Sequence, residues 1–307
     1  MKDLIIQKLQ NQNVYLESEK SDINKLLIKL KNCTFRQLSK NLRIDESTLR
    51  RWRRKGKIPI DLIIQLKSKF PKETRSIIEK ISYLSTPKSN QKLKIPDLNE
   101  EVGYLLGYVS GDGHLRDPLK HNSQWEITVE SWTDKKTLEI LKKILKENFE
   151  IRSSITKNKT RKGWRLTINC KLLHLILNRV FKIPVGKKAD KIKIPKIIQN
   201  LPSNILQSYI RGWFDSEGFV TTSKKKLQIE FYVKNRNVLN WMKKQLKIIG
   251  INVYQKRKKG TLIIRRSEFD NFNSKIGFWH RKQSSKLAGS RVSGNTRTPS
   301  DGHDYWA

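Results

Sequence analysis

Apolar residues recur with helical spacing through much of the first 86 residues, and beyond Asn99 helical and strand-like patterns alternate. The second part reads helix, strand, strand, helix, strand, strand, helix, and the same order then repeats. The first copy runs from residue 101 to residue 181, and the second from residue 203 to residue 279. The pattern predicts an α+β fold in which two pseudo-symmetric αββαββα repeats form antiparallel sheets, preceded by a small all-α domain.

The predicted domain boundaries follow these changes of pattern. Residues 1–86 form the helical domain, and residues 87–97, which contain two prolines and no periodicity, form a linker. The first repeat, with the connector that follows it, occupies residues 98–200, and the second repeat occupies residues 201–286. Residues 287–307 show no periodicity and are expected to form a disordered tail.

Within the first domain, "TFRQLSKNLRIDESTLRRWRRKG" (residues 34–56) predicts two short helices joined by a turn. Asp45 can cap the second helix, on which Leu49 and Trp52 face inward. The segment resembles a helix-turn-helix, although Arg43 stands where such turns often use glycine. A helical module with a basic, solvated face is the alternative. The DNA-binding residues predicted on the outward face are Ser47, Thr48, Arg50, Arg51 and Arg53.

Strand alternation separates an apolar face from a polar face in each repeat. Every second residue is polar in "QWEITVE" and "GWRLTIN" of the first repeat and in "LQIEFYVK" of the second. Such a polar face can read bases in the major groove of DNA, or it is the solvated side of an ordinary antiparallel sheet. The DNA contacts predicted on and beside these strands are Arg116, Gln124, Glu126, Arg165, Lys225, Gln228, Glu230 and Arg257.

The charge balance favours a polyanionic partner. The 307 residues include 65 Lys and Arg against 28 Asp and Glu, a formal net charge of +37. Nucleic acid is the expected partner, and a ribosome-like RNA binder or a merely lysine-rich surface is the alternative. Cys33 and Cys170 are too isolated for a disulfide framework or a zinc site. No apolar run approaches the roughly 20 residues of a membrane span, so we expect a cytoplasmic protein without a membrane partner.

Two stretches, "LLGYVSGDG" (residues 105–113) and "IRGWFDSEG" (residues 210–218), each end a helical pattern with an acid and a glycine. Small residues precede both acids at every fourth position, where they share one helix face and allow two backbones to approach closely. We therefore predict that the two helices pack on each other. The predicted interface residues are Gly103, Gly107, Ser208 and Gly212.

Packing of these helices would bring Asp112 and Glu217 together at two helix C-termini, with Gly113 and Gly218 as left-handed caps. Two carboxylates at the negative ends of two helix dipoles repel each other. A divalent cation removes this repulsion and leaves room for phosphate and water. The two stretches thus predict a metal-binding region with Mg²⁺ as the expected cofactor. Scission of two phosphodiester strands needs two such centres, and each acid can serve one while they share metals.

The same two stretches resemble the signature helices of the LAGLIDADG homing endonucleases, a likeness that covers about residues 97–286. The resemblance implies saddle-like sheets and a site-specific double-strand DNA endonuclease with a long asymmetric target, working as a monomer. It implies Asp112 and Glu217 as catalytic metal ligands, helped by the backbone carbonyls of Gly111 and Ser216, with Mn²⁺ able to replace Mg²⁺. Lys234 matches a basic residue near the active-site water or scissile phosphate and is predicted to be catalytic, the alternative being a phosphate-contacting or solvated lysine.

The first repeat departs from this pattern, because its strand ends at Glu130 and Ser131 without a lysine. Cleavage of one DNA strand is therefore expected to be slow, or to use Lys135 or Lys136. The connector "PVGKKADKIKIP" (residues 184–195) resembles the inter-repeat stretch of archaeal and intein-borne members, and Lys188 is predicted to contact the DNA backbone. By the same resemblance we expect a prokaryotic, archaeal, nucleoid-associated protein.

Two other functions stay open at this point. The same family also supplies intron maturases, whose partner is structured intron RNA, and the missing lysine of the first repeat favours this alternative. A DNA-binding transcriptional regulator with a catalytically decayed endonuclease fold is the other, although the presence of both acids speaks against it.

Overall fold

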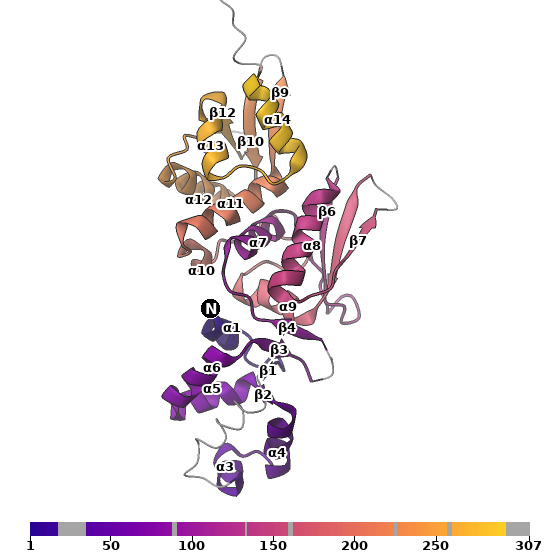
Figure 1. Cartoon of the computed structure of the whole chain (residues 1–307), viewed down its shortest axis with the longest axis vertical. Helices are drawn as coiled ribbons and strands as arrows, with labels where there is room; N and C mark the ends of the chain where they lie inside the picture. Colours follow the sequence, from indigo (N-terminus) through magenta and orange to yellow (C-terminus); the bar gives the residue numbers. More distant parts are fainter. Residues whose placement is uncertain are drawn as a thin grey trace, which may run out of the picture.

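A computed structural model describes residues 1–17, 35–87, 91–132, 134–158, 162–223, 226–256 and 260–292. The molecule is an elongated array with the N-terminal part at one end, the first repeat in the middle and the second repeat at the other end (Figure 1). Within the described ranges, no helix is long and apolar enough to cross a membrane.

The N-terminal part combines helices with a four-stranded antiparallel sheet in the order β2-β1-β3-β4. Buried apolar side chains of Ile58, Leu16, Leu84 and Leu93 form a row across all four strands. Its elements are α1 (Lys2–Lys8), β1 (Tyr15–Glu17), α3 (Phe35–Leu42), α4 (Glu46–Lys55), β2 (Lys57–Pro59), α5 (Ile60–Lys69), α6 (Pro71–Lys80), β3 (Tyr83–Ser85) and β4 (Lys92–Lys94).

This sheet makes the prediction of an all-α domain wrong. Each of its strands has only three residues, which is too short for a two-residue alternation to stand out from helical spacing. The predicted linker also contains β4, which pairs with β3. The domain boundaries as such stay a prediction.

The α3–α4 pair turns sharply at Arg43, whose φ of 52° lies in the left-handed region. The turn is closed by the backbone N–H of Ile44, which donates to the Ser39 carbonyl at 3.1 Å, and by the Ser39 hydroxyl, which donates to the Ile44 carbonyl at 2.6 Å. Asp45 occupies the N-cap position of α4, but its side chain makes no capping hydrogen bond. Leu49 is fully buried, as its predicted inward position requires.

The first repeat forms a sheet in the order β5-β6-β8-β7, with α8 packed against β6 and β8. Its last helix, α9, continues into a π-helical turn, η1, and a short helix, α10, lies in the connector that follows. The elements are α7 (Glu100–Asp112), β5 (His114–Leu115), β6 (Glu126–Ser131), α8 (Lys135–Phe149), β7 (Ser154–Lys157), β8 (Trp164–Asn169), α9 (Lys171–Leu175), η1 (Ile176–Val180) and α10 (Lys196–Gln199).

The second repeat repeats this order, with a sheet arranged β11-β12-β10-β9. The predicted α+β fold with duplicated αββαββα units is therefore confirmed. Its elements are α11 (Ser203–Glu217), β9 (Gly218–Ser223), β10 (Lys226–Tyr232), α12 (Arg236–Ile248), β11 (Tyr254–Lys256), β12 (Thr261–Arg265), η2 (Arg266–Glu268) and α13 (Phe269–Lys275).

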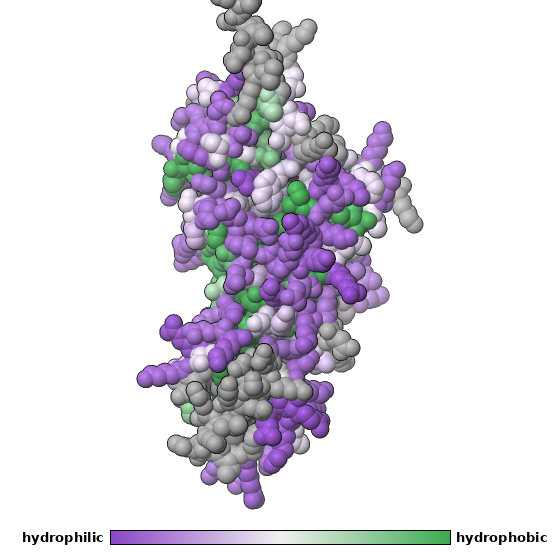
Figure 2. All heavy atoms as spheres, viewed as in Figure 1, coloured by the Kyte–Doolittle hydropathy of each residue, from purple (hydrophilic) through white to green (hydrophobic). Residues whose placement is uncertain are grey.

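A further helix, α14 (Arg281–Val292), follows the second repeat and packs along β9. Leu287 on this helix is buried, so the predicted disordered tail does not begin at residue 287. Residues 293–307 lie outside the described part of the chain. Hydrophilic side chains cover much of the visible molecular face, including the surface over α8 (Figure 2).

Candidate functional site

The helices α7 and α11 make the most extensive contact between any two elements of the described chain. Their backbones approach closely at two glycines. A Cβ atom on Gly107 would lie 2.8 Å from the carbonyl carbon of Tyr209, and one on Gly212 would lie 2.6 Å from the backbone nitrogen of Tyr108. Real Cβ atoms do not approach backbone atoms so closely, so both positions require glycine.

The same face continues toward both ends of the helix pair. A Cβ atom on Gly103 would lie 2.8 Å from the Ile205 carbonyl oxygen, and Ser208 is buried. At the other end, a Cβ atom on Gly111 would lie 3.2 Å from Cγ of Glu217. The close packing thus extends to the place where both helices end in an acid.

Gly113 and Gly218, which follow the two acids, have φ values of −68° and −96° and are extended. The prediction of left-handed caps was therefore wrong. The chain passes straight from each helix into the first strand of its repeat, and a Cβ atom would lie 2.6 Å from the Val109 carbonyl oxygen at Gly113 and 2.5 Å from that of Phe214 at Gly218. Glycine serves here to avoid a collision with the preceding helical turn.

Asp112 and Glu217 share one electrostatic environment. Asp112 is exposed and Glu217 is half-buried, yet the protein atoms around both disfavour their charged forms. Desolvation by these surrounding atoms, opposed by the charge of Lys188 and strengthened by that of Glu130, raises the pKa of Asp112 to about 6. Burial and the neighbouring charge of Asp112 raise the pKa of Glu217 to about 7.

Lys188, which the sequence predicts to contact the DNA backbone, lies beside the two acids. Its ammonium group donates to the Val109 carbonyl at 3.1 Å and to the Gly113 carbonyl, at the negative end of the α7 dipole. Burial lowers the pKa of Lys188 to about 8, and the charges of Asp112 and Glu217 limit this shift. The lysine therefore offsets part of the repulsion between the acids.

The connector reaches this position by pairing with the edge strand of the first repeat. Val185 forms a parallel bridge with Leu115, and the N–H of Gly186 donates to the Leu115 carbonyl at 2.8 Å. A positive φ of 71° at Gly186 then turns the chain toward Lys188. Sequence spacing cannot reveal this, because the paired residues lie far apart in the chain.

Lys234, predicted to be catalytic, forms an ion pair with a residue of the connector. Its ammonium group pairs with Asp190 Oδ2 at 3.0 Å, and its side chain is 62% exposed. It is not among the charges that shift the pKa values of Asp112 and Glu217.

Strand register identifies the counterpart of Lys234 in the first repeat. His114 and Phe219 each follow a motif glycine, so they are equivalent. His114 pairs with Thr128 and Phe219 pairs with Glu230, so Thr128 and Glu230 are equivalent as well. Four residues further along the chain, just beyond the ends of β6 and β10, Trp132 therefore corresponds to Lys234. Of the alternatives expected in the first repeat, Lys135 pairs with Glu139 at 3.0 Å, and Lys136 is exposed on α8.

The polar side chains predicted to read DNA bases are largely paired with one another. In the first repeat Arg116 pairs with Glu126 at 3.1 Å and also donates to Gln124, and Arg165 pairs with Glu130 at 2.6 Å.

In the second repeat Glu230 accepts hydrogen bonds from Gln228 at 2.6 Å and from Lys256 at 3.1 Å. Base contacts would require these pairs to open or to be shared with DNA. Lys225 and Arg257 lie outside the described residues. Of the predicted α4 contacts, Ser47, Arg51 and Arg53 are exposed, Thr48 is half-buried, and Arg50 pairs with Glu46 at 2.6 Å.

Asp215, two residues before the second acid, has a structural role that spacing alone did not reveal. It is buried, and its Oδ2 accepts from the Tyr104 hydroxyl at 2.8 Å and from the Trp279 backbone N–H at 2.9 Å. Burial raises the pKa of Asp215 to about 7, and these hydrogen bonds oppose the shift. Ser110, the equivalent residue of the first motif, lies 3.4 Å from the Tyr209 hydroxyl that donates to it.

The donor set at the helix ends fits a hard divalent cation. Asp112 and Glu217 supply carboxylate oxygens, and the carbonyls of Gly111 and Ser216 lie in last helical turns, where carbonyls lack intrahelical partners. Within the described ranges, no group of three or more His, Cys, Asp and Glu residues could hold a metal ion. Mg²⁺ commonly binds one or two carboxylates and takes its other ligands from water and phosphate, so this smaller set is sufficient.

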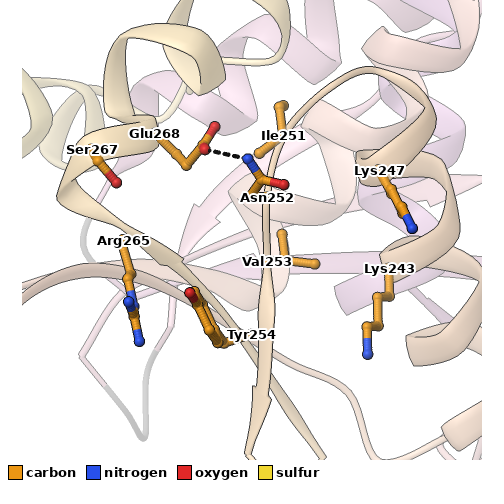
Figure 3. Close-up of a pocket in the computed structure, with 9 residues that line it drawn as sticks. All are labelled: Lys243, Lys247, Ile251, Asn252, Val253, Tyr254, Arg265, Ser267 and Glu268. Atoms are coloured by element: carbon orange, nitrogen blue, oxygen red, sulfur yellow. Dashed lines mark hydrogen bonds between the residues drawn. The ribbon is translucent and has the colours of Figure 1, made fainter.

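A separate hollow of about 470 Å³ lies between α12 and the β11–β12 hairpin (Figure 3). Lys243 and Lys247 of α12 line one side, and Arg265 lies over the ring of Tyr254 on the other. Lysines at the corresponding positions of α8 line a hollow of about 510 Å³ in the first repeat. The two hollows are part of the duplicated fold, and neither is lined by the motif acids.

Comparison with known proteins places this geometry in a family. The model of the LAGLIDADG-like domain matches residues 99–180 and 204–277, slightly more than half of the chain.

Three curated proteins illustrate the relatives. A probable translation initiation factor IF-2 from Methanocaldococcus jannaschii is 28% identical over 159 residues, which are 50% of this chain and 13% of that protein. Elongation factor 2 from Methanopyrus kandleri is 26% identical over 190 residues, which are 61% of this chain and 14% of that protein. The chain thus spans only a small part of these two relatives. An uncharacterized protein from M. jannaschii is 25% identical over 281 residues, 87% of this chain and 85% of that protein.

Two solved structures are also similar. I-DmoI in complex with DNA and Mn is 16% identical with a TM-score of 0.43, and the match covers 59% of this chain and 98% of that chain. Full-length DUF199/WhiA from Thermatoga maritima is 18% identical with a TM-score of 0.43, and the match covers 64% of this chain and 62% of that chain.

Proposed function

Because the chain belongs to the LAGLIDADG-like domain family, we propose that it is a site-specific double-strand DNA endonuclease that depends on a divalent metal ion. The observation that carries this proposal is the convergence of Asp112, Glu217 and Lys188 at the ends of two closely packed helices. Acids whose pKa values are raised by partial desolvation and that lie beside a cation are typical of catalytic centres.

The two acids would hold the metal ion, together with the carbonyls of Gly111 and Ser216. Mg²⁺ or Mn²⁺, when bound, supplies positive charge that stabilises the reacting phosphate and activates water. Raised pKa values of about 6 for Asp112 and about 7 for Glu217 mean that both are fully ionised only above neutral pH. Metal binding and cleavage should therefore increase as pH rises from 6 to 8.

Lys188 is proposed to take the role that we first expected of Lys234. Its ammonium group is held between helix carbonyls and the acids, where it can stabilise negative charge on a scissile phosphate. Lys234 instead holds the connector through Asp190. The chain thus provides a lysine at the acid pair although the first repeat lacks one on its strand.

Double-stranded DNA is the proposed substrate, with a long and asymmetric target. The net charge of +37 supplies phosphate contacts, so binding should weaken steeply with salt. The paired polar side chains on both sheets, such as Arg165 and Gln228, are proposed to contact base edges. Because the side chains of the two sheets differ, the two halves of the target should differ as well. Nucleoid association and an archaeal source also stay predictions.

The test is selection of cleavable duplexes from a randomised library incubated with the protein and Mg²⁺, followed by sequencing of the cut ends. The proposal predicts one enriched sequence cut at fixed positions on both strands, and no cutting in EDTA. Enrichment by binding without cutting in Mg²⁺ or Mn²⁺ would instead indicate a DNA-binding regulator. Failure to enrich any duplex, together with dependence of an intron's splicing on the protein, would indicate a maturase.

A further inference from the structure

We infer that the α3–α4 pair reads a second DNA segment, separate from the cleavage site and located beyond the half-site that the first repeat covers. This inference rests on the proposed function insofar as both require double-stranded DNA. It adds the position of an extra recognition subsite, on one side of the target only.

The chemistry of α4 suits a DNA contact. Its ten residues include four arginines and one lysine against one glutamate. Leu49 is buried and Trp52 is half-buried, so these two residues fix the helix on its inner face. Ser47 and Arg51 are exposed on the outer face, which places short polar groups near the N-terminus and cations along the helix.

A rigid path connects α4 to the first repeat. Gly56, with a φ of 67°, ends α4 and leads directly into β2. The sheet then continues through β1 and β3 to β4, and its buried row of Ile58, Leu16, Leu84 and Leu93 holds the strands together. Three inter-strand spacings of about 4.8 Å place the two edges of this sheet about 14 Å apart.

The β4 edge of this sheet is anchored on the first repeat. The Tyr83 hydroxyl donates to the Glu150 carboxylate at 3.1 Å, and Lys94 lies 3.8 Å from the same group at the end of α8. Gln91 donates to the carbonyl of Asn169 at 3.4 Å. The helix α1 also packs against η1 of the first repeat. These contacts cover both a strand edge and a helix, so they restrict rotation as well as translation.

The resulting order along the long axis of the molecule is α3–α4, first repeat, second repeat (Figure 1). Helices α7 and α11 set the two repeats side by side, so the target is read in the same order. The α3–α4 pair can then extend the footprint only at the end occupied by the first repeat. A mobile tether would instead allow the extra contact on either side.

The experiment compares binding motifs selected from a randomised 60-base-pair library in Ca²⁺, followed by a cleavage assay in Mg²⁺. Arg50→Ala with Arg51→Ala removes two exposed cations of α4, and Arg51→Gln is a milder second variant. Lys72→Ala with Arg75→Ala removes two exposed cations of α6 and is the charge-matched control. Arg165→Ala and Gln228→Ala identify the positions read by the first and second repeats.

We expect the motifs selected by both α4 variants to lack positions at one end of the wild-type motif. The missing positions should lie next to those that depend on Arg165. Affinity for the wild-type duplex should fall about tenfold in the double variant and less than threefold in the control. A motif of unchanged width in the α4 variants, or loss of positions at the end that depends on Gln228, would overturn the inference. If the wild-type protein still cleaves the selected duplex in Mg²⁺, the proposed function stands regardless of that outcome. A one-sided extension without cleavage would support the inference and contradict the endonuclease, and failure to select any motif would overturn both.

Discussion

The two repeats share an element order and a motif helix, but they secure that helix by different means. In the second repeat the buried carboxylate of Asp215 holds Tyr104 and the backbone of Trp279. In the first repeat, within the part of the chain that the structure describes, the side chain of the equivalent Ser110 makes only a long contact of 3.4 Å to the Tyr209 hydroxyl. The polar anchoring of the helix pair therefore depends mainly on the second motif.

The segments that follow the two repeats both cover the exposed edge of the first strand, but they do so with different contacts. After the first repeat, Val185 pairs with the edge strand β5 and brings Lys188 to the acids. After the second repeat, Gln283 of α14 accepts from the N–H of Val220 at 2.9 Å, and Lys286 donates to the carbonyl of the same residue at 3.3 Å. Both segments cover the edge of a first strand, yet the first brings a cation to the acid pair. Duplication thus preserved the architecture while the polar groups diverged.

The largest effect should come from a feature that both repeats share. Gly107→Ala forces a Cβ atom against the backbone of Tyr209, and we expect a loss of about 4 kcal/mol or more in unfolding free energy, because a backbone cannot move aside. Urea unfolding measures the loss. Gly186→Ala is the control, since its Cβ meets no atom of the described residues within 4 Å; its positive φ should cost about 1 kcal/mol. Equal losses would show that α7 and α11 do not pack as described.

The next largest loss of stability should differ between the two repeats. Asp215→Ala leaves the Tyr104 hydroxyl and the Trp279 N–H without their acceptor in a buried site, for an expected loss of about 3 kcal/mol. Ser110→Ala removes only a 3.4 Å contact and should lose less than about 1 kcal/mol. Asp215→Asn keeps an acceptor oxygen and should recover most of the difference. The midpoints of urea unfolding measure all three variants, and a larger loss at Ser110 would reverse the comparison.

The two lysines provide a third contrast, measured as the single-turnover cleavage rate of the selected duplex. Lys188→Met removes the cation beside the acids, and we expect a rate loss of about 30-fold, or about 2 kcal/mol of transition-state stabilisation. Lys234→Met breaks a surface ion pair with Asp190, and the rate should fall less than threefold. The opposite ranking would restore Lys234 as the catalytic lysine.

The smallest effect is a pH dependence of stability. The raised pKa of Glu217, about 7, means that the folded protein retains a proton which the unfolded chain releases at lower pH. The resulting destabilisation appears as pH rises above the ordinary value of 4.5 and is complete above about 7. In EDTA, Glu217→Gln should therefore stabilise the protein at pH 8 by about 1 kcal/mol after allowance for solvent screening, with little gain near pH 4.5.

Glu268 supplies the control of opposite sign. Hydrogen bonds from Asn252 and Asn271 lower its pKa, so its charged form stabilises the folded state at every pH above the ordinary pKa of 4.5. Glu268→Gln should therefore destabilise the protein at pH 8. Thermal unfolding at pH 5 and pH 8 measures both variants. Stabilisation by both, or by neither, would show that the environment of Glu217 is not as described.

Features encoded by local spacing could be predicted from the sequence. Gly107 and Gly212 lie on matched helix faces, so their packing follows from a four-residue spacing that is visible in the sequence itself. The duplicated element order is equally local. By contrast, the three-residue strands around Leu16 are too short to show a period, and their sheet depends on pairing between distant segments.

The site was less predictable for the same reason. Asp112 and Glu217 could be chosen from their position at helix ends, but the place of Lys188 depends on the bridge between Val185 and Leu115. The role of Asp215 depends on Trp279, which lies in another segment. Long-range backbone pairing decides both, and a single sequence carries no direct record of it.

The central claim is that Asp112 and Glu217 form one catalytic centre, and single-turnover cleavage of the selected duplex by Asp112→Asn, Glu217→Gln and the double variant tests it most directly. The account predicts that all three bind the duplex within about threefold of wild type, whereas cleavage of both strands by the double variant falls by about 1,000-fold or more. Cleavage at the wild-type rate by the double variant would contradict it.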